Sequence, residues 1–231
     1  MAVNNSDRDA SDALPSAITE GLLAEIVGVP GEVQEIDVAG ARLVADPSGV
    51  VWWAEKRLLA VADLHFEKGS AFAAKTGQML PPYDTHATLK RLSAVVERFE
   101  PKTIVTLGDN FHDGAGPARL DAAARGAINA LMRGRRFVWI EGNHDAAAAL
   151  SLGGECAPVV EIGPLVFRHE PSVGGALGEL CGHLHPVARV ATRVRQVRRR
   201  CFVGDGTRLV LPAFGAYTGG LDVFDEAFAG L

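Results

Sequence analysis

Short apolar runs alternate with amphipathic stretches in the middle of the chain, and this alternation constrains the fold more than any other feature. Three runs contain no charged residue, which is typical of strands buried on both faces; they are residues 58–62, 103–107 and 137–140. Between the first two, Asp84 or Thr85 can cap a helix that reaches residue 99 and keeps its leucines and valines on one face. Pro117 can begin a second helix. This order predicts an α/β core with parallel strands.

Shorter strands are expected on either side of this core. Residues 36–45 and 50–54 read as two strands joined by a type I turn at Asp46-Pro47-Ser48-Gly49. After residue 150 the runs are short and leave little room for helices, so we expect a second, largely antiparallel sheet; its strands are predicted at 165–167, 178–181, 197–203, 209–211 and 221–223.

Side chains that bind metals follow five of the predicted strands. The five segments are Asp63-Leu64-His65, Gly108 to Asp113, Gly142-Asn143-His144-Asp145, His169, and Gly182-His183-Leu184-His185. They hold six of the seven histidines, the exception being His86. In open α/β sheets, sites form at the carboxyl ends of the strands. A mixed nitrogen and oxygen ligand set suits a divalent ion such as Mn²⁺, Fe²⁺ or Zn²⁺.

The spacing within these segments favours convergence on one site. Asp63 and His65 are two residues apart, as are His183 and His185, so on an extended chain each pair points to one side. Glycines precede several of the segments and are expected to let the backbone turn sharply; they are Gly108, Gly142 and Gly182. Each segment alone also fits a surface turn or a buried histidine. The five together, in this order, predict a metal centre.

The same segments resemble the calcineurin-like metallophosphoesterase superfamily over roughly residues 58–186. A closer resemblance, to the ligase-associated DNA damage response endonucleases of bacteria, extends over nearly everything after the first residues. The motifs that carry it are Ala62-Asp63-Leu64-His65-Phe66-Glu67-Lys68-Gly69, Leu80-Pro81-Pro82-Tyr83-Asp84-Thr85, Arg168-His169-Glu170-Pro171 and the stretch from Leu211 to Gly220. The resemblance implies a four-layer αββα sandwich of two mixed β-sheets, the metallo-dependent phosphatase fold.

The resemblance also implies a role for each site residue. One of two divalent metals, Mn²⁺ first with Fe²⁺ or Zn²⁺ as alternatives, would be held by Asp63, His65, His185 and the bridging Asp109. The other would be held by Asp109, Asn143, His169 and His183. A hydroxide shared by the metals would attack phosphorus without a covalent intermediate. His144 would protonate or steady the leaving oxygen, and His112 matches a supporting histidine of the nuclease branch.

One position departs from the superfamily pattern. Glycine often precedes the histidine of the fourth segment, whereas Arg168 stands there in this chain. We expect its side chain either to touch the substrate phosphate or to pair with Glu170. Other residues of the closer motifs are candidates for the wall of a substrate cleft; they are Lys68, Tyr83, Tyr217 and Thr218. For Tyr217 and Thr218, the alternative is that they lie in a plain glycine-rich loop.

An arginine-rich stretch follows the last histidines. It holds six arginines in twelve residues and no acid; they are Arg189, Arg193, Arg195, Arg198, Arg199 and Arg200. By contrast, residues 1–50 hold two basic and nine acidic residues. The stretch is either a surface that contacts DNA phosphates, mainly through Arg198, Arg199 and Arg200, or a solvated face whose arginines pair with the acidic N-terminal segment.

Three functions remain open from the sequence. The first is a DNA endonuclease or phosphodiesterase in ligase-associated DNA repair, with DNA, a DNA ligase and a helicase as partners. The second is a small-molecule phosphoesterase acting on cyclic nucleotides or nucleotide diphosphates. The third is a non-catalytic scaffold, which the intact ligand set and His144 argue against.

The composition fits one globular domain. The chain has 231 residues, of which 48% are hydrophobic and 22% charged, as in ordinary globular proteins. We expect a disordered acidic tail at 1–18, which lacks the features of a secretory signal, and a single domain at 19–231. The three cysteines are odd in number and none are closely spaced, which argues against a disulfide framework or a cysteine-rich zinc site and favours the cytoplasm. No apolar run reaches the ~18–20 residues of a membrane span, so no membrane association is expected.

Overall fold

The computed structural model describes residues 25–27, 32–78, 83–145, 148–174, 177–191 and 195–229. The expected tail at 1–18, the Leu80-Pro81-Pro82 part of one motif, and Arg193 lie outside the described residues.

The middle of the chain forms a seven-stranded sheet in the order β2-β3-β4-β5-β6-β7-β8. Its strands are β2 (Gln34–Val38), β3 (Ala41–Asp46), β4 (Val50–Trp53), β5 (Leu58–Val61), β6 (Thr103–Leu107), β7 (Arg136–Ile140) and β8 (Glu155–Ala157). β5 to β8 are parallel, and β2 to β5 pair antiparallel. The single strand expected at 36–45 is wrong, because Ala39 and Gly40 have positive φ angles of 51° and 80° and turn the chain into a hairpin.

The second sheet has six strands in the order β1-β14-β15-β11-β10-β9. They are β1 (Glu25–Val27), β9 (Val159–Ile162), β10 (Leu165–Arg168), β11 (Glu179–Cys181), β14 (Phe202–Gly204) and β15 (Arg208–Val210). Three of its strand pairs are antiparallel, as expected, but β11 pairs parallel with both β10 and β15, so the sheet is mixed. The expected α/β fold with two mixed sheets is confirmed.

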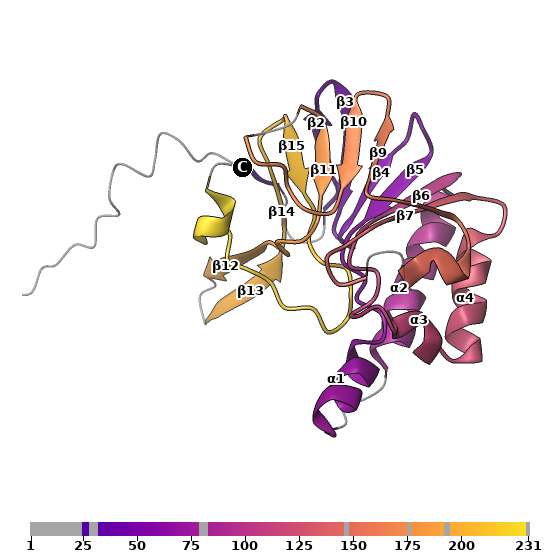
Figure 1. The fold of residues 1–231 in the computed structure, drawn as a ribbon. Helices are drawn as coiled ribbons and strands as arrows, with labels where there is room; N and C mark the ends of the chain where they lie inside the picture. The colour runs from indigo at the N-terminus through magenta and orange to yellow at the C-terminus, as the bar shows by residue number, and fades with distance from the viewer. Residues whose placement is uncertain are drawn as a thin grey trace, which may run out of the picture.

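The strand expected at 197–203 is divided between two sheets. β12 (Val187–Ala191) and β13 (Gln196–Arg200) form a separate antiparallel hairpin, which extends from the body on the side opposite the helices (Figure 1). The chain then leaves the hairpin at Cys201 and enters β14. The strand expected at 221–223 is reduced to one isolated bridge, between Asp222 and Val187.

Helices cover one face of the seven-stranded sheet (Figure 1). The covering helices are α2 (Asp84–Phe99) and α4 (Ala122–Met132), with the short α3 (Gly116–Arg119) beside them, whereas α1 (Lys68–Thr76) projects away from the sheet at the bottom of the view. Asp84 does not cap α2 as expected. Its buried carboxylate accepts from the backbone N of Gly69 at 3.0 Å, in the first turn of α1. The helix expected from Pro117 divides in two because the Asp121 side chain accepts from Ala124 N at 2.7 Å and begins α4 anew.

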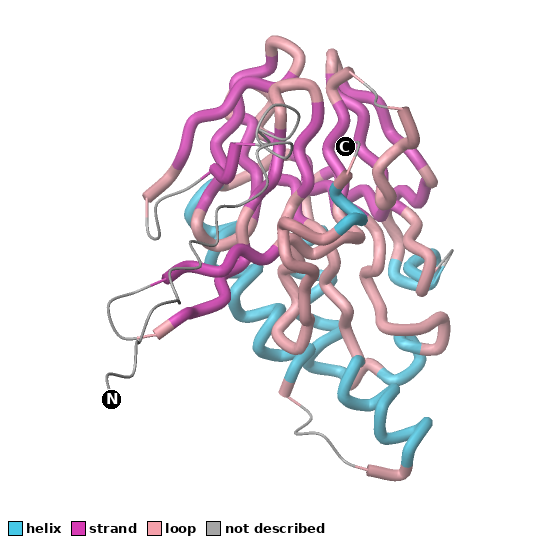
Figure 2. The backbone as a smooth tube through the Cα atoms, turned by 90° about the vertical axis from the view of Figure 1, so that its left-hand side faces the viewer, coloured by secondary structure: helices cyan, strands magenta, loops and turns pink. Residues whose placement is uncertain are grey.

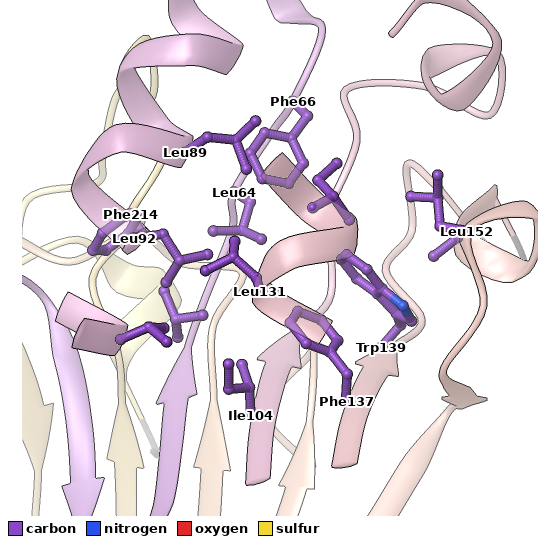
Figure 3. Packing of buried hydrophobic residues seen from close by; sticks show 14 of the residues in the cluster. Leu64, Phe66, Leu89, Leu92, Ile104, Leu131, Phe137, Trp139, Leu152 and Phe214 are labelled. Atoms are coloured by element: carbon purple, nitrogen blue, oxygen red, sulfur yellow. The ribbon is translucent and has the colours of Figure 1, made fainter. Parts of the chain in front are cut away.

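Two large apolar clusters lie on either side of the seven-stranded sheet. On the helical side, Leu89 lies beside Phe66, and Leu92 and Leu131 lie beside Leu64, between the helices and the strands (Figure 3). On the other side, residues of β3 to β7 face those of β10, β11 and β15. β5 contributes to both clusters, Leu59 to the first and Leu58 to the second, so it is buried on both faces as expected.

The outer face of the second sheet carries a third, smaller cluster. In the described chain, this face is covered by the base of the hairpin and a 3₁₀ turn at Glu226–Phe228, which contribute Ala188 and Phe228 to a cluster with Cys181 and Val210. None of the described helices combines the length and apolar character needed to cross a lipid bilayer.

Candidate metal centre

The seven predicted ligands come together where the carboxyl ends of β5, β6, β7, β10 and β11 meet. Loops gather at this end of the strands, beside the helices (Figure 2). Potential ligand atoms of Asp63, His65 and His185 lie within 4.8 Å of one another, and so do those of Asp63, Asp109 and His169.

The remaining two predicted ligands join the second of these groups through His169. Its Nε2 atom lies 2.9 Å from Asn143 Oδ1 and 3.1 Å from His183 Nδ1. All seven side chains therefore form one continuous cluster. By contrast, His86 lies on the surface, where its Nε2 is 2.8 Å from Asp121 Oδ2.

Backbone pairing beyond the ends of β5 and β6 places His65 beside Asp109. His65 N donates to Asp109 O at 2.9 Å, and Phe66 N donates to Asn110 O at 2.8 Å. The pairing continues with His112 N donating to Phe66 O at 3.0 Å. As a result, His65 Nε2 lies 3.7 Å from Asp109 Oδ2, and the rings of His65 and His112 are 5.8 Å apart.

The ligand loops are not extended, contrary to expectation. Positive φ angles occur at Asp63 (53°), His65 (43°), Asp109 (44°), His183 (69°) and His185 (48°). Asp and His occupy this left-handed region more readily than bulkier or β-branched residues, and such strained positions concentrate at functional sites. The paired ligands converge because the chain turns sharply at each one, not because they alternate along a strand.

Two of the three site glycines are required for a different reason from the one expected. Gly108 does have a positive φ, of 74°. Gly142 and Gly182 do not, but neither position has room for a side chain. A Cβ atom on Gly142 would overlap the backbone nitrogen and Oδ1 of Asp109, and one on Gly182 would overlap the carboxylate of Asp63.

Burial keeps several of the site imidazoles neutral. It is the main cause that lowers the pKa of His65 to about 2, with the nearby His185 as the next cause. Burial also lowers the pKa of His112 and of His183, followed by the charges of Lys68 and His169 respectively. A neutral imidazole keeps a free lone pair, which a metal ligand needs.

The donor set fits divalent cations. Ring nitrogens of His65 and His185 lie 3.4 Å apart beside two buried carboxylates, Asp63 and Asp109. Such a concentration of lone pairs and negative charge is stabilised by a cation. His169 is also oriented as metal-binding histidines are, because its Nδ1 is 2.9 Å from the carbonyl of Leu107 and its Nε2 faces the cluster.

The family model for calcineurin-like phosphoesterases matches residues 56–200, which include every one of these ligands. The chain belongs to this family. Among solved structures, the nuclease MPE of Pseudomonas putida aligns with a TM-score of 0.67 and 29% identity, covering 83% of this chain and 91% of that one. No match is found among the curated proteins. The His/Asp clusters of this metallophosphoesterase are typical of dinuclear metal sites.

His144 lies at the open side of the phosphoesterase site. Its side chain is 45% exposed, whereas that of Asp109 is only 4% exposed. The backbone N of His144 donates to Asp109 Oδ1 at 3.1 Å, and its Nε2 is 3.8 Å from Asp109 Oδ2. Its ring stacks on that of His112 at 5.6 Å. His144 is therefore held beside the ligands but remains accessible to a substrate.

Two acidic residues that lie at the site were not predicted as part of the metal centre. Asp145 is buried, and its carboxylate accepts from the backbone N of Asn110, Phe111 and Gly142 at 2.8, 3.0 and 3.1 Å. It thereby ties the loop after β7 to the loop after β6. In the sequence, Asp145 stands at the end of Gly-Asn-His-Asp and is not a predicted ligand. This position could have indicated that it supports the neighbouring ligands. Glu170 Oε1 lies 4.0 Å from His183 Nδ1 and groups with His169 and His183.

Arg168 pairs with a different acid from the one expected. Its Nη1 lies 3.8 Å from Oε2 of Glu179, and among the described residues it forms no ion pair with Glu170. Glu179 is fully buried and also binds Arg208, at 2.6 Å from Nε. The structure thus places Arg168 in an ion cluster between β10, β11 and β15. A phosphate contact by Arg168 stays a prediction.

The arginines of the hairpin differ in their surroundings. Arg189 pairs with Asp222 at 2.6 Å. Arg198 donates to Gly220 O at 2.8 Å, and the exposed Arg199 donates to the carbonyl of Arg198. Arg200 donates to the loop at 214–218. Within the described chain, the charges of Arg198, Arg199 and Arg200 have no carboxylate partner.

Proposed function

We propose that this metallophosphoesterase is a phosphodiesterase that cleaves DNA, with two divalent metal ions held by the seven clustered ligands. The observation that carries the proposal is the convergence of all seven ligand side chains, with the accessible His144 beside them. The likeness to a Pseudomonas nuclease favours DNA over a small phosphodiester. The sequence resemblance further favours an endonuclease in ligase-associated DNA repair, with a ligase and a helicase as partners and Mn²⁺ as the metal.

The proposed roles of the site residues follow from their burial and position. Metal ions bound there supply positive charge for the phosphate oxygens and lower the pKa of a water molecule. Asp109 lies at the centre, within 3.7 Å of His65 Nε2 and 3.4 Å of His169 Nε2, and so is placed to serve both metals. His144 is placed to donate a proton to the leaving oxygen, with His112 stacked behind it to hold its ring.

Metal and substrate dependence test the proposal directly. Protein stripped with a chelator is given Mn²⁺, Zn²⁺ or Mg²⁺ separately and assayed on a phosphodiester, a phosphomonoester, and single-stranded, nicked and gapped DNA. We expect metal-dependent cleavage of the diester and of DNA. Cleavage of the diester without cleavage of DNA would favour the small-molecule phosphoesterase. The absence of hydrolysis with every metal would favour the non-catalytic scaffold.

Removing the free charges of the hairpin is expected to weaken DNA binding. Arg198 and Arg199 are exposed and have no carboxylate partner among the described residues. Each phosphate contact contributes roughly 0.7–0.9 to the slope of log K against log salt. The double variant R198M/R199M should therefore bind DNA more weakly and with a flatter salt dependence, as measured by fluorescence anisotropy with chelator present.

A matched double variant provides the control for this measurement. Lys90 and Arg133 are exposed on the helical layer, so K90M/R133M removes the same charge elsewhere. It should leave DNA affinity and salt slope nearly unchanged. If both double variants weaken DNA binding equally, net charge alone is responsible. If R198M/R199M binds DNA as the wild type does, the arginines form only a solvated face.

A further inference from the structure

The loop at 213–221 is bonded to the backbone of one metal-ligand segment. Phe214 N donates to Ala62 O at 2.9 Å, and Gly215 N donates to Asp63 O at 3.0 Å. Gly215 is packed so closely that a Cβ atom there would overlap the carbonyl of Leu64. The first half of the loop therefore supports the turn that carries Asp63.

The other end of the same loop contacts a second ligand segment. Leu221 O accepts from Val187 N at 2.8 Å, just after His185. A Cβ atom on Gly220 would overlap the carbonyl oxygen of His185. The loop thus spans the backbones of Asp63 and His185, whose Oδ1 and Nε2 atoms lie 3.2 Å apart in one of the ligand groups.

Arg200 holds the middle of this loop from the end of β13. Its Nη2 donates to Gly215 O and to Thr218 Oγ1, each at 2.8 Å, and its Nη1 donates to Phe214 O at 3.3 Å. Thr218 Oγ1 in turn donates to Gly215 O at 2.8 Å. These contacts use the fork of the guanidinium, which a lysine ammonium cannot reproduce.

A second arginine supports only the beginning of the loop. Arg91 donates to Phe214 O at 3.0 Å, and its guanidinium lies 4.4 Å from the centre of the Phe214 ring. Within the described chain, Arg91 forms no hydrogen bond with Gly215 or Thr218, so it does not duplicate the contacts of Arg200 to the middle of the loop.

We infer that Arg200 is a positioning residue for the metal half-site made by Asp63, His65 and His185. It acts through the loop at 213–221, which sets the distance between the Asp63 and His185 segments. The inference rests on the proposed dinuclear site. It assigns to Arg200 a role different from the phosphate contact expected from the sequence.

Manganese binding to metal-free protein tests this role. Titration calorimetry with Mn²⁺ should show two equivalents bound by the wild type. In R200M, one equivalent should bind about 10-fold more weakly, as is usual when a supporting contact of a ligand is lost, and the other should be unchanged. At limiting Mn²⁺, the electron paramagnetic resonance spectrum of the wild type should show a coupled pair of ions, and that of R200M should show a single ion. R200K should restore at most part of the affinity.

The control is R199M, because Arg199 is adjacent on β13 and, among the described residues, its side chain bonds to the neighbouring carbonyl of Arg198 and not to the loop. R199M should bind both equivalents as the wild type does. Wild-type binding of both equivalents by R200M would overturn the inference, and so would equal weakening of both, which general destabilisation produces. A wild-type protein that takes up no Mn²⁺ would instead overturn the proposed dinuclear site, and the role of Arg200 with it.

Discussion

Replacing Asp109 by asparagine is expected to abolish hydrolysis and to reduce the metal content of the protein. Asp109 is 3% exposed and lies beside predicted ligands of both metals, with Oδ2 3.7 Å from His65 Nε2 and Oδ1 3.4 Å from His169 Nε2. Asparagine keeps the shape but removes the negative charge that a ligand shared by two cations supplies. Turnover of a phosphodiester and metal analysis after dialysis against Mn²⁺ measure the two effects.

Asp113 offers a nearby control for the loss of charge. Its carboxylate pairs with Arg119 at 2.8 Å and belongs to neither ligand group. D113N should therefore retain two metals and most of the activity. Near-wild-type turnover by D109N would contradict the two-metal scheme as a whole.

Replacing His144 by alanine is expected to slow hydrolysis by ~10²–10⁴-fold, the usual contribution of a general acid. The metals should stay bound, because His144 is 45% exposed and belongs to none of the ligand groups. The loss should be smaller for a substrate with an acidic leaving group such as p-nitrophenol, which needs less protonation as it departs. Comparison of kcat for two diesters that differ in leaving group measures this difference.

His86 provides the control for the histidine substitution. It is exposed, pairs with Asp121 at 2.8 Å, and is the histidine that lies outside the site segments. H86A should keep full activity. Loss of metal from H144A would mean that His144 is a ligand, and an equal loss of rate for both leaving groups would contradict the role of an acid.

Much of the fold was predictable because its core strands are apolar on both faces. β5, β6 and β7 occur where the charge-free runs predicted them, and α2 ends at Phe99 as its apolar face indicated. The predictions of helix and strand ends were wrong where one residue could serve two neighbouring elements. Asp84 looked like a cap for α2, yet its carboxylate binds the first turn of α1, 15 residues earlier in the chain. Local sequence does not show which of two helix ends a side chain will reach.

The course of the chain after residue 186 was harder to predict, for a similar reason. One apolar and basic run supplies both β13 and β14, which belong to different sheets. The division at Cys201 depends on which strands lie nearby, since β13 pairs with β12 and β14 pairs with β15. Because the strand ends at this point, Arg198, Arg199 and Arg200 lie on β13, in the hairpin, and not in the second sheet.

The sequence by itself predicted which side chains cluster at the candidate metal centre, because ligand types placed after successive strands meet at one edge of a sheet. Tertiary structure alone decided how they are held. Left-handed turns at Asp63 and His185, the absence of space beside Gly142, and the carboxylate of Asp145 all depend on atoms from distant segments. It also separated Arg200, which clamps a loop, from Arg199, which faces solvent. Adjacent arginines look alike in sequence, but neighbouring residues of a strand point to opposite faces and meet different partners.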